Sequence, residues 1–114
     1  MSVHLLNRSK NKMLASQLES ATSFWQRSRG LLGRTQLESN RALWIRPCNS
    51  IHTCFMKFSI DAIFVDRELI VRQVKRGIPP WRIVMPVWGA HSVFELPENS
   101  STGVEQGDQL YVGD

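Results

Sequence analysis

The sequence predicts a mainly β fold, β-rich α+β in class: a compact antiparallel sandwich or barrel with one short helix in its N-terminal half. Three observations predict this class. About seven short apolar segments alternate with turn residues, and helix signals gather in a single stretch. The 114 residues, 42% of them apolar, can form one core without disulfide or metal staples. There is no internal repeat, so we expect one domain over residues 1–114.

The chain opens with a predicted hairpin. Residues 3–6 are apolar and indicate an edge strand, residues 7–12 are polar and basic as in a turn, and residues 13–18 indicate a second strand. Three more short strands are expected at 42–45, 92–96 and 109–112.

Residues 21–30 carry the signals of a helix of two or three turns. Ser23 and Gln26 have the spacing of a capping box, basic residues fill the last turn, and Gly30 or Gly33 can end the helix. The apolar residues that this segment should bury are Phe24, Trp25, Leu31 and Leu32.

The stretch 50–66, SIHTCFMKFSIDAIFVD, organises the rest of the chain. Read with period two, one side of it is apolar and belongs to the core: Met56, Phe58, Ile60, Ala62 and Phe64. A strand over 55–65 would be about twice the usual length, so we expect a break within 58–60. Residues 70–75 should return as its antiparallel partner.

Asp61 lies on the opposite side of this stretch, beside apolar neighbours. Four residues offer an acid–base cluster if the central strand, the long loop and the 92–96 strand converge: His52, Asp61, His91 and Glu95. We favour a structural role, in which Asp61 is covered and bonded by backbone amides of the 58–60 turn or by a side chain such as His52 or Lys57.

A metal site is not predicted. The nearest constellation has none of the usual ligand spacings: Cys48, His52, Cys54 and His91. We therefore expect no metal and no cofactor, and two reduced, partly buried thiols, with a metal site or a disulfide as lesser alternatives.

Residues 77–91 form a Pro- and Trp-rich loop in which Trp81 and Trp88 either cover the core or wall a binding site. The candidate ligand-binding residues are His52, Lys57, Asp61, Trp81, Trp88, His91 and Glu95. Arg27, Arg29 and Arg34 are candidates for an anion site, although we favour the simpler interpretation that they complement the helix dipole.

Charge is unevenly distributed along the chain. Residues 1–57 carry 9 Lys and Arg against 2 Asp and Glu, whereas residues 58–114 carry 5 against 8. A basic first half with interleaved tryptophans is compatible with nucleic acid, but a solvated surface is the favoured reading because the basic residues are scattered. No apolar run approaches the length of a membrane span, and no signal peptide is recognisable. We expect a cytoplasmic monomer without a membrane partner.

Three segments closely resemble the family called domain of unknown function 192. They are RSRGLLGR (27–34), IHTCFMKFSIDAIFVD (51–66) and SVFELPENSSTGVEQGDQL (92–110). The resemblance implies a jelly-roll-like sandwich or barrel and no particular reaction. The positions that fall on the family's pattern are Arg27, Gly30, Arg34, Ile51, His52, Thr53, Met56, Ile60, Asp61, Phe64, Asp66, Glu95, Gly107 and Asp108.

No catalytic spacing is present, so the favoured function is a small binding or accessory module for a small molecule or a protein, with a cleft near the Pro- and Trp-rich loop. An enzyme is less favoured and would use an acid–base cluster of Asp61, His52 and Glu95. A weak nucleic-acid binder acting through the basic N-terminal half is the third hypothesis.

Overall fold

A five-stranded sheet forms the centre of the molecule. The computed structural model describes residues 3–113 and is 43% strand and 5% helix, which confirms the mainly β class. The elements are β1 His4–Asn7, β2 Lys12–Ala15, β3 Gln17–Ala21, α1 Phe24–Arg29, β4 Arg41–Ile45, β5 Ile51–His52, β6 Ile60–Val65, β7 Val71–Ile78, β8 Ile83–Val84, β9 Ser92–Pro97 and β10 Leu110–Gly113.

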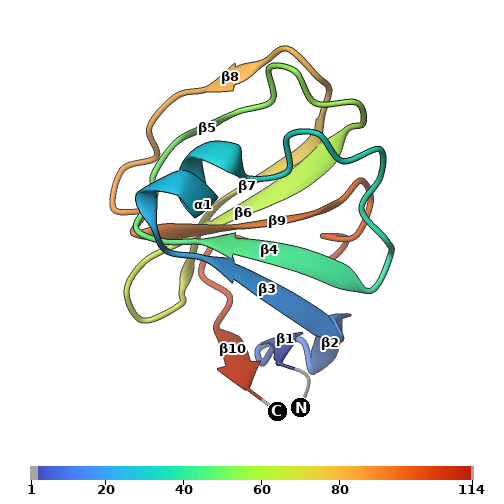
Figure 1. Cartoon of the computed structure of the whole chain (residues 1–114). Helices are drawn as coiled ribbons and strands as arrows, with labels where there is room; N and C mark the ends of the chain where they lie inside the picture. The colour runs from blue at the N-terminus through green and yellow to red at the C-terminus, as the bar shows by residue number, and fades with distance from the viewer. Residues whose placement is uncertain (1–2, 114) are drawn as a thin grey trace.

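The central sheet has the order β3-β4-β9-β6-β7. Its pairs are antiparallel except β3 with β4, which is parallel. A three-stranded sheet, β10-β1-β2, lies at one end, and a ribbon of β5 and β8 lies at the other end, above α1 (Figure 1). The sheets do not close on themselves, so the predicted barrel alternative is not what the chain forms.

Strand β6 is buried on both faces, because every one of its residues is covered. Ile60, Ala62 and Phe64 join one core cluster, together with Met56. Ile63 and Val65 join the second cluster on the other face. The period-two interpretation of this strand is confirmed.

The strand begins only at Ile60, so residues 55–59 are not the strand that we expected. The reason lies in the backbone: Phe55 has φ 67°, a left-handed conformation that no strand residue adopts. Met56 N donates to Thr53 O at 3.1 Å and closes a turn there. The expected break is therefore the start of β6.

Helix α1 has the predicted capping box: Gln26 N donates to Ser23 Oγ at 3.1 Å, and Ser23 N donates to Gln26 Oε1 at 3.2 Å. Its six residues make fewer than two turns, however, and none of them is buried. Phe24 and Trp25 are 65% and 79% exposed, so their predicted burial is wrong. The chain buries Leu31 and partly buries Leu32 instead.

The second predicted strand, 13–18, is two strands. Both Ser16 N and Gln17 N donate to Asn40 O at 3.0 Å, which turns the chain out of β2 and into β3. Strand β2 stays in the hairpin with β1, and β3 runs parallel to β4. The predicted hairpin is thus confirmed, and the parallel pair was not anticipated.

Candidate functional site

A cleft lies beneath α1, between the helix and the central sheet. Its volume is about 250 Å³. Its wall comes from α1 and the residues that follow it, from the segment after β4, and from one residue of β9. The lining residues are Phe24, Arg27, Ser28, Arg29, Gly30, Leu31, Leu32, Ile45, Pro47, Cys48, Ser50, Ile51, His52, Met56 and Glu95. All three segments that carry the family resemblance therefore meet at this cleft.

Glu95 lies at the sheet side of the cleft. It is a residue of β9 and pairs with Leu43 of β4 and with Ala62 of β6. Both neighbours belong to the core cluster under α1, so Glu95 is on that face of the sheet. The residue is only 3% exposed. A Cβ built on Gly30 would lie 3.9 Å from Glu95 Oε1, which places the carboxyl group directly beside the helix end.

Burial raises the pKa of Glu95 to about 7, and the positive charge of Arg34 opposes this rise. Within residues 3–113, no group donates a hydrogen bond that would stabilise the ionised carboxylate of Glu95. A buried carboxyl group without a partner is costly in its charged form. Near neutral pH, Glu95 is therefore divided between the protonated and ionised forms.

The rim of the cleft is polar. Arg27 Nη1 donates to Pro47 O at 3.3 Å, whereas Arg27 Nε is buried without a partner. Cys48 Sγ donates to Ser50 O at 3.0 Å, and burial raises the pKa of the Cys48 thiol. His52 is exposed at the same rim. The cleft thus combines an apolar wall with a few polar groups, as ligand sites usually do.

Asp61 lies on the other face of the sheet. Its Oδ1 accepts from Gly77 N at 2.9 Å, and its Oδ2 accepts from Ser101 N at 3.0 Å and from Ser101 Oγ at 2.6 Å. The expectation that Asp61 is covered and bonded is confirmed, because the residue is fully buried. The expected partners, the 58–60 turn, His52 or Lys57, are wrong.

The structure separates several of the other candidates. Asp61 is divided from Glu95 by the sheet, so the predicted cluster with His52 does not assemble around it. The candidates that do share the cleft are Arg27, Arg29, His52 and Glu95. Arg34 Nη1 instead donates to Glu19 Oε2 at 2.8 Å.

The remaining ligand-binding candidates do not line the cleft under α1, although the backbone of His91 accepts a hydrogen bond from the cleft residue Cys48. Trp81 packs against Phe55 with ring centroids 4.6 Å apart, and Trp88 is 90% exposed. Lys57 is exposed, and His91 is half-buried near Pro47. Sequence reasoning missed the apolar wall, such as Leu31 and Ile45, because these residues read as ordinary core. The available signals were the glycine before Leu31 and the family pattern, on which Ile51 and Met56 of the same wall fall.

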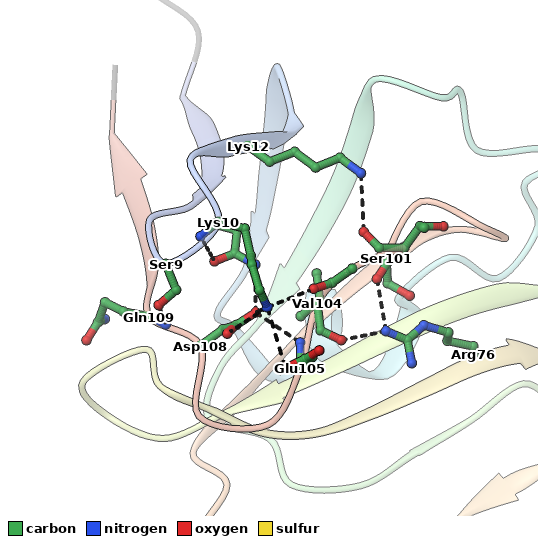
Figure 2. A network of polar contacts seen from close by, with 12 residues as sticks. Ser9, Lys10, Lys12, Arg76, Ser101, Val104, Glu105, Asp108 and Gln109 are labelled. Carbon is green, nitrogen blue, oxygen red and sulfur yellow. Dashed lines mark hydrogen bonds and ion pairs between the residues drawn. The ribbon is translucent and has the colours of Figure 1, made fainter.

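The motif residue Asp108 belongs to a separate polar network (Figure 2). Asp108 Oδ2 accepts from Asn7 Nδ2 at 2.9 Å, from Glu105 N at 3.0 Å and from Lys10 Nζ at 2.9 Å. Partial burial works against ionisation, but these bonds outweigh it and lower the pKa of Asp108. Arg76 Nη2 donates to the carbonyl oxygens of Ser101 and Val104. The network fastens the last loop to β1 and β7, so its role is structural.

The described residues contain neither a cluster of metal ligands nor a helix that could span a membrane. Over residues 3–113, no group of three or more His, Cys, Asp and Glu side chains lies close enough to hold a metal ion. In the same range, no helix has both the length and the apolar character needed to cross a membrane.

The chain is similar to proteins whose activities are not established. A UPF0127 protein of Thermococcus sibiricus is 36% identical over 113 residues, which are 93% of this chain and 72% of the relative. A UPF0127 protein of Pyrococcus horikoshii is 34% identical over 93% of this chain and 96% of its own length.

A solved structure of a protein of unknown function from Novosphingobium aromaticivorans has a TM-score of 0.80 at 19% identity, covering 96% of this chain and 82% of that one. Another, from Sinorhizobium meliloti and provisionally described as a transcription regulator, has a TM-score of 0.77 at 21% identity, covering 96% and 91%. These two likenesses show the fold. A family model described as an uncharacterised conserved protein matches residues 5–112, and the chain belongs to that family, domain of unknown function 192.

Proposed function

We propose that this protein is a small-molecule binding module and that its ligand enters the cleft beneath α1. The observation that carries the proposal is the state of Glu95. The residue is 3% exposed, lines a cleft of about 250 Å³, and its carboxyl group has no hydrogen-bond donor from the described chain. A ligand that donates a hydrogen bond would supply the missing partner.

The size and lining of the cleft limit the ligand. The cleft is smaller than the roughly 300–1,000 Å³ of sites for drug-sized molecules, so a small molecule or one small group of a larger molecule fits. Seven apolar side chains line it: Phe24, Leu31, Leu32, Ile45, Pro47, Ile51 and Met56. The ligand class is therefore a compact apolar body that carries one N–H or O–H donor.

Matched probes test this proposal. Benzylamine and benzyl alcohol each offer a donor on a small apolar body, and toluene offers the same body without the donor. We expect the two donor probes to shift the NMR signals of the Leu31, Ile45 and Met56 methyl groups at concentrations where toluene does not. In Glu95→Gln, benzylamine should no longer bind better than toluene. Glu98 is exposed, so in the control variant Glu98→Gln the preference for benzylamine should be unchanged.

Three results would reject the proposal: no methyl shift with any probe, equal shifts with toluene, or an unchanged preference in Glu95→Gln. Benzylamine adds a further check because it is a cation. Its binding should favour the ionised carboxylate and so lower the pKa of Glu95 below about 7, as read from the side-chain carboxyl 13C shift.

A second candidate function, an acid–base enzyme, is favoured by the same pKa. A carboxyl group that titrates near neutral pH can both take and give a proton under working conditions. Glu95 shares its cleft with His52 and Cys48. The test is turnover of chromogenic ester and glycoside panels; activity that is lost in Glu95→Gln while the fold remains would favour catalysis over binding alone.

The nucleic-acid hypothesis has less support. Its basic residues are divided between separate parts of the molecule: Lys10 lies between β1 and β2 and is paired with Asp108, whereas Arg27 is in α1 and lines the cleft. Arg34 and Arg41 are paired with Glu19 and Glu38. The provisional description of one structural neighbour as a regulator keeps the test worthwhile. Binding to a generic duplex should weaken steeply with salt if the hypothesis holds.

A further inference from the structure

One end of the molecule displays a concentration of exposed hydrophobic side chains. Seven of them come from α1, from the turn after β5, and from the chain around β8, and each is between 58% and 90% exposed. We call this set the aromatic surface: Phe24, Trp25, Phe55, Trp81, Ile83, Met85 and Trp88. The other exposed large hydrophobic residues of the described chain lie in or beside β1, β2 and β10, at the opposite end: Val3, Met13 and Tyr111 (Figure 1).

Several members of the aromatic surface lie against one another. Phe24 and Trp25 are in edge-to-face contact with centroids 5.4 Å apart. Trp81 N donates to Thr53 O at 3.0 Å, which holds the Trp81 turn against the turn of Phe55. A shallow groove of about 590 Å³ contains Ile83 and Met85 and shares three lining residues with the cleft under α1: Ser50, Ile51 and His52. The groove beside Ile83 and Met85 therefore adjoins the cleft that Phe24 lines.

The backbone holds two of these side chains outward. Phe55 and Trp81 have φ 67° and 68°, in the left-handed region that bulky residues rarely occupy. Such conformations persist where the surrounding structure fixes them, and they gather at functional surfaces. Here they present two neighbouring rings at the tip of the ribbon.

The segments that form this end carry more basic than acidic residues. The three segments, 22–37, 46–60 and 77–94, contain six basic residues and no Asp or Glu. Arg34 among the six is paired with Glu19, whereas Arg29, Lys57 and Arg82 are exposed. The nearby carboxyl group of Glu95 is buried. The aromatic surface therefore has exposed basic residues beside it.

We propose that the aromatic surface docks on the surface of membranes that contain anionic phospholipids. Tryptophan favours the boundary between lipid and water, and Ile83 and Met85 can enter the acyl region beneath it. The exposed basic residues would meet the lipid phosphates. Peripheral contact of this kind requires no membrane-spanning helix.

The shape of the surface favours lipid over a macromolecular partner. Its side chains project from a helix, a short strand and several turns, so a rigid protein would need a matching set of pockets. A fluid bilayer accommodates projecting side chains without such a match. A single-stranded nucleic acid would stack its bases on rings along a positive track, and Ile83 and Met85 offer no ring for stacking.

Sedimentation with vesicles tests the proposal on the full chain. We expect binding to mixed phosphatidylcholine and phosphatidylglycerol vesicles and much weaker binding to phosphatidylcholine alone. The double variant Trp81→Ala, Trp88→Ala should bind the anionic vesicles at least about tenfold more weakly, because two interfacial side chains are lost. The matched control, Met13→Ala with Tyr111→Ala at the opposite end, should bind as the parent protein does.

Tryptophan fluorescence provides a second measurement of the contact between the aromatic surface and the lipid. Brominated phospholipids should quench the emission of the parent protein and should quench the Trp81→Ala, Trp88→Ala variant less. Since both residues are exposed, circular dichroism should show an unchanged fold. Glu95→Gln should leave vesicle binding unchanged, which separates this proposal from the small-molecule site.

Three outcomes would overturn the proposal. They are no binding to anionic vesicles even at low salt, equal losses in the control variant, and binding to single-stranded DNA without binding to vesicles. The last result would assign the aromatic surface to nucleic acid instead.

Discussion

Asp61 and Ser101 are 40 positions apart in the chain, and the Ser101 hydroxyl donates to Asp61 Oδ2 at 2.6 Å inside the protein. The backbone N–H groups of Ser101 and Gly77 donate to the same carboxylate. One buried side chain thus joins strand β6 to the end of β7 and to the loop after β9. The carboxylate accepts three hydrogen bonds, so its burial does not require a catalytic explanation.

Removing this carboxylate should destabilise the protein without affecting the cleft. Asp61→Ala leaves three donors unmet, two of them buried, at about 1–3 kcal/mol for each buried donor, so we expect a loss of a few kcal/mol in the free energy of unfolding. Asp61→Asn should lose an intermediate amount of stability. Its amide oxygen still accepts a hydrogen bond, but its N–H groups face a donor that bonded to the second carboxylate oxygen. Urea unfolding measures both, with Glu98→Ala as an exposed control. A variant Asp61→Ala as stable as the parent would contradict the structural role.

Glu95 predicts an unusual dependence of stability on pH. Its folded pKa of about 7 lies above the ordinary glutamate value of 4.5, so the folded protein binds more protons than the unfolded chain between these values. The contribution of Glu95 to the free energy of unfolding is therefore fully present below about pH 4.5, and it is lost as the pH rises through about 7. The full loss is on the order of 3 kcal/mol. The difference in unfolding free energy between the parent and Glu95→Gln isolates this dependence. A difference that does not change with pH would contradict it.

Gly30 and Gly33 form a matched pair for the helix end. Both have positive φ, 49° and 84°, so alanine is strained at either position, at a cost of about 1 kcal/mol or more. Only at Gly30 would the added Cβ approach Glu95, whereas nothing lies within 4 Å at Gly33. Both variants should lower the melting temperature. Only Gly30→Ala should also weaken the binding of benzylamine, and equal weakening by Gly33→Ala would show that strain alone is responsible.

Asp108 predicts the opposite dependence on pH. Hydrogen bonds from Asn7, Glu105 and Lys10 lower its pKa, so its contribution to stability is present above the ordinary pKa of an aspartate and is lost as the pH falls through the folded value. Asn7→Ala should reduce resistance to acid unfolding more than Glu105→Gln, because the side chain of Glu105 is largely exposed. Acid titration followed by circular dichroism measures the midpoints. Coincident midpoints would contradict this role for Asn7.

The sequence predicted best where the determinants were local. The period-two pattern placed Ile60, Ala62 and Phe64 in one core, and the spacing of Ser23 and Gln26 predicted the capping box. Both signals depend on neighbours within a few positions. A left-handed residue such as Phe55 has no comparable signal, because aromatic residues rarely adopt that conformation.

Features that depend on distant contacts were not predictable. Nothing near Asp61 indicates that Ser101 would provide its donors, and nothing in the first strands indicates the parallel pairing of β3 with β4. The composition of the candidate cleft also depends on distant contacts. Arg27, His52 and Glu95 were separately recognisable as polar residues of interest, but only the folded chain brings them to one wall.

The two sides of the cleft differ in how freely they can move. Glu95 is held in the middle of a sheet, bonded through its strand to β4 on one side and to β6 on the other, so its amide should exchange with solvent only when the whole protein unfolds. Helix α1 has six residues and buries none of them, so fewer contacts hold it than hold the sheet. Any adjustment of the cleft to an entering molecule should therefore come from the helix side, while the sheet side stays in place.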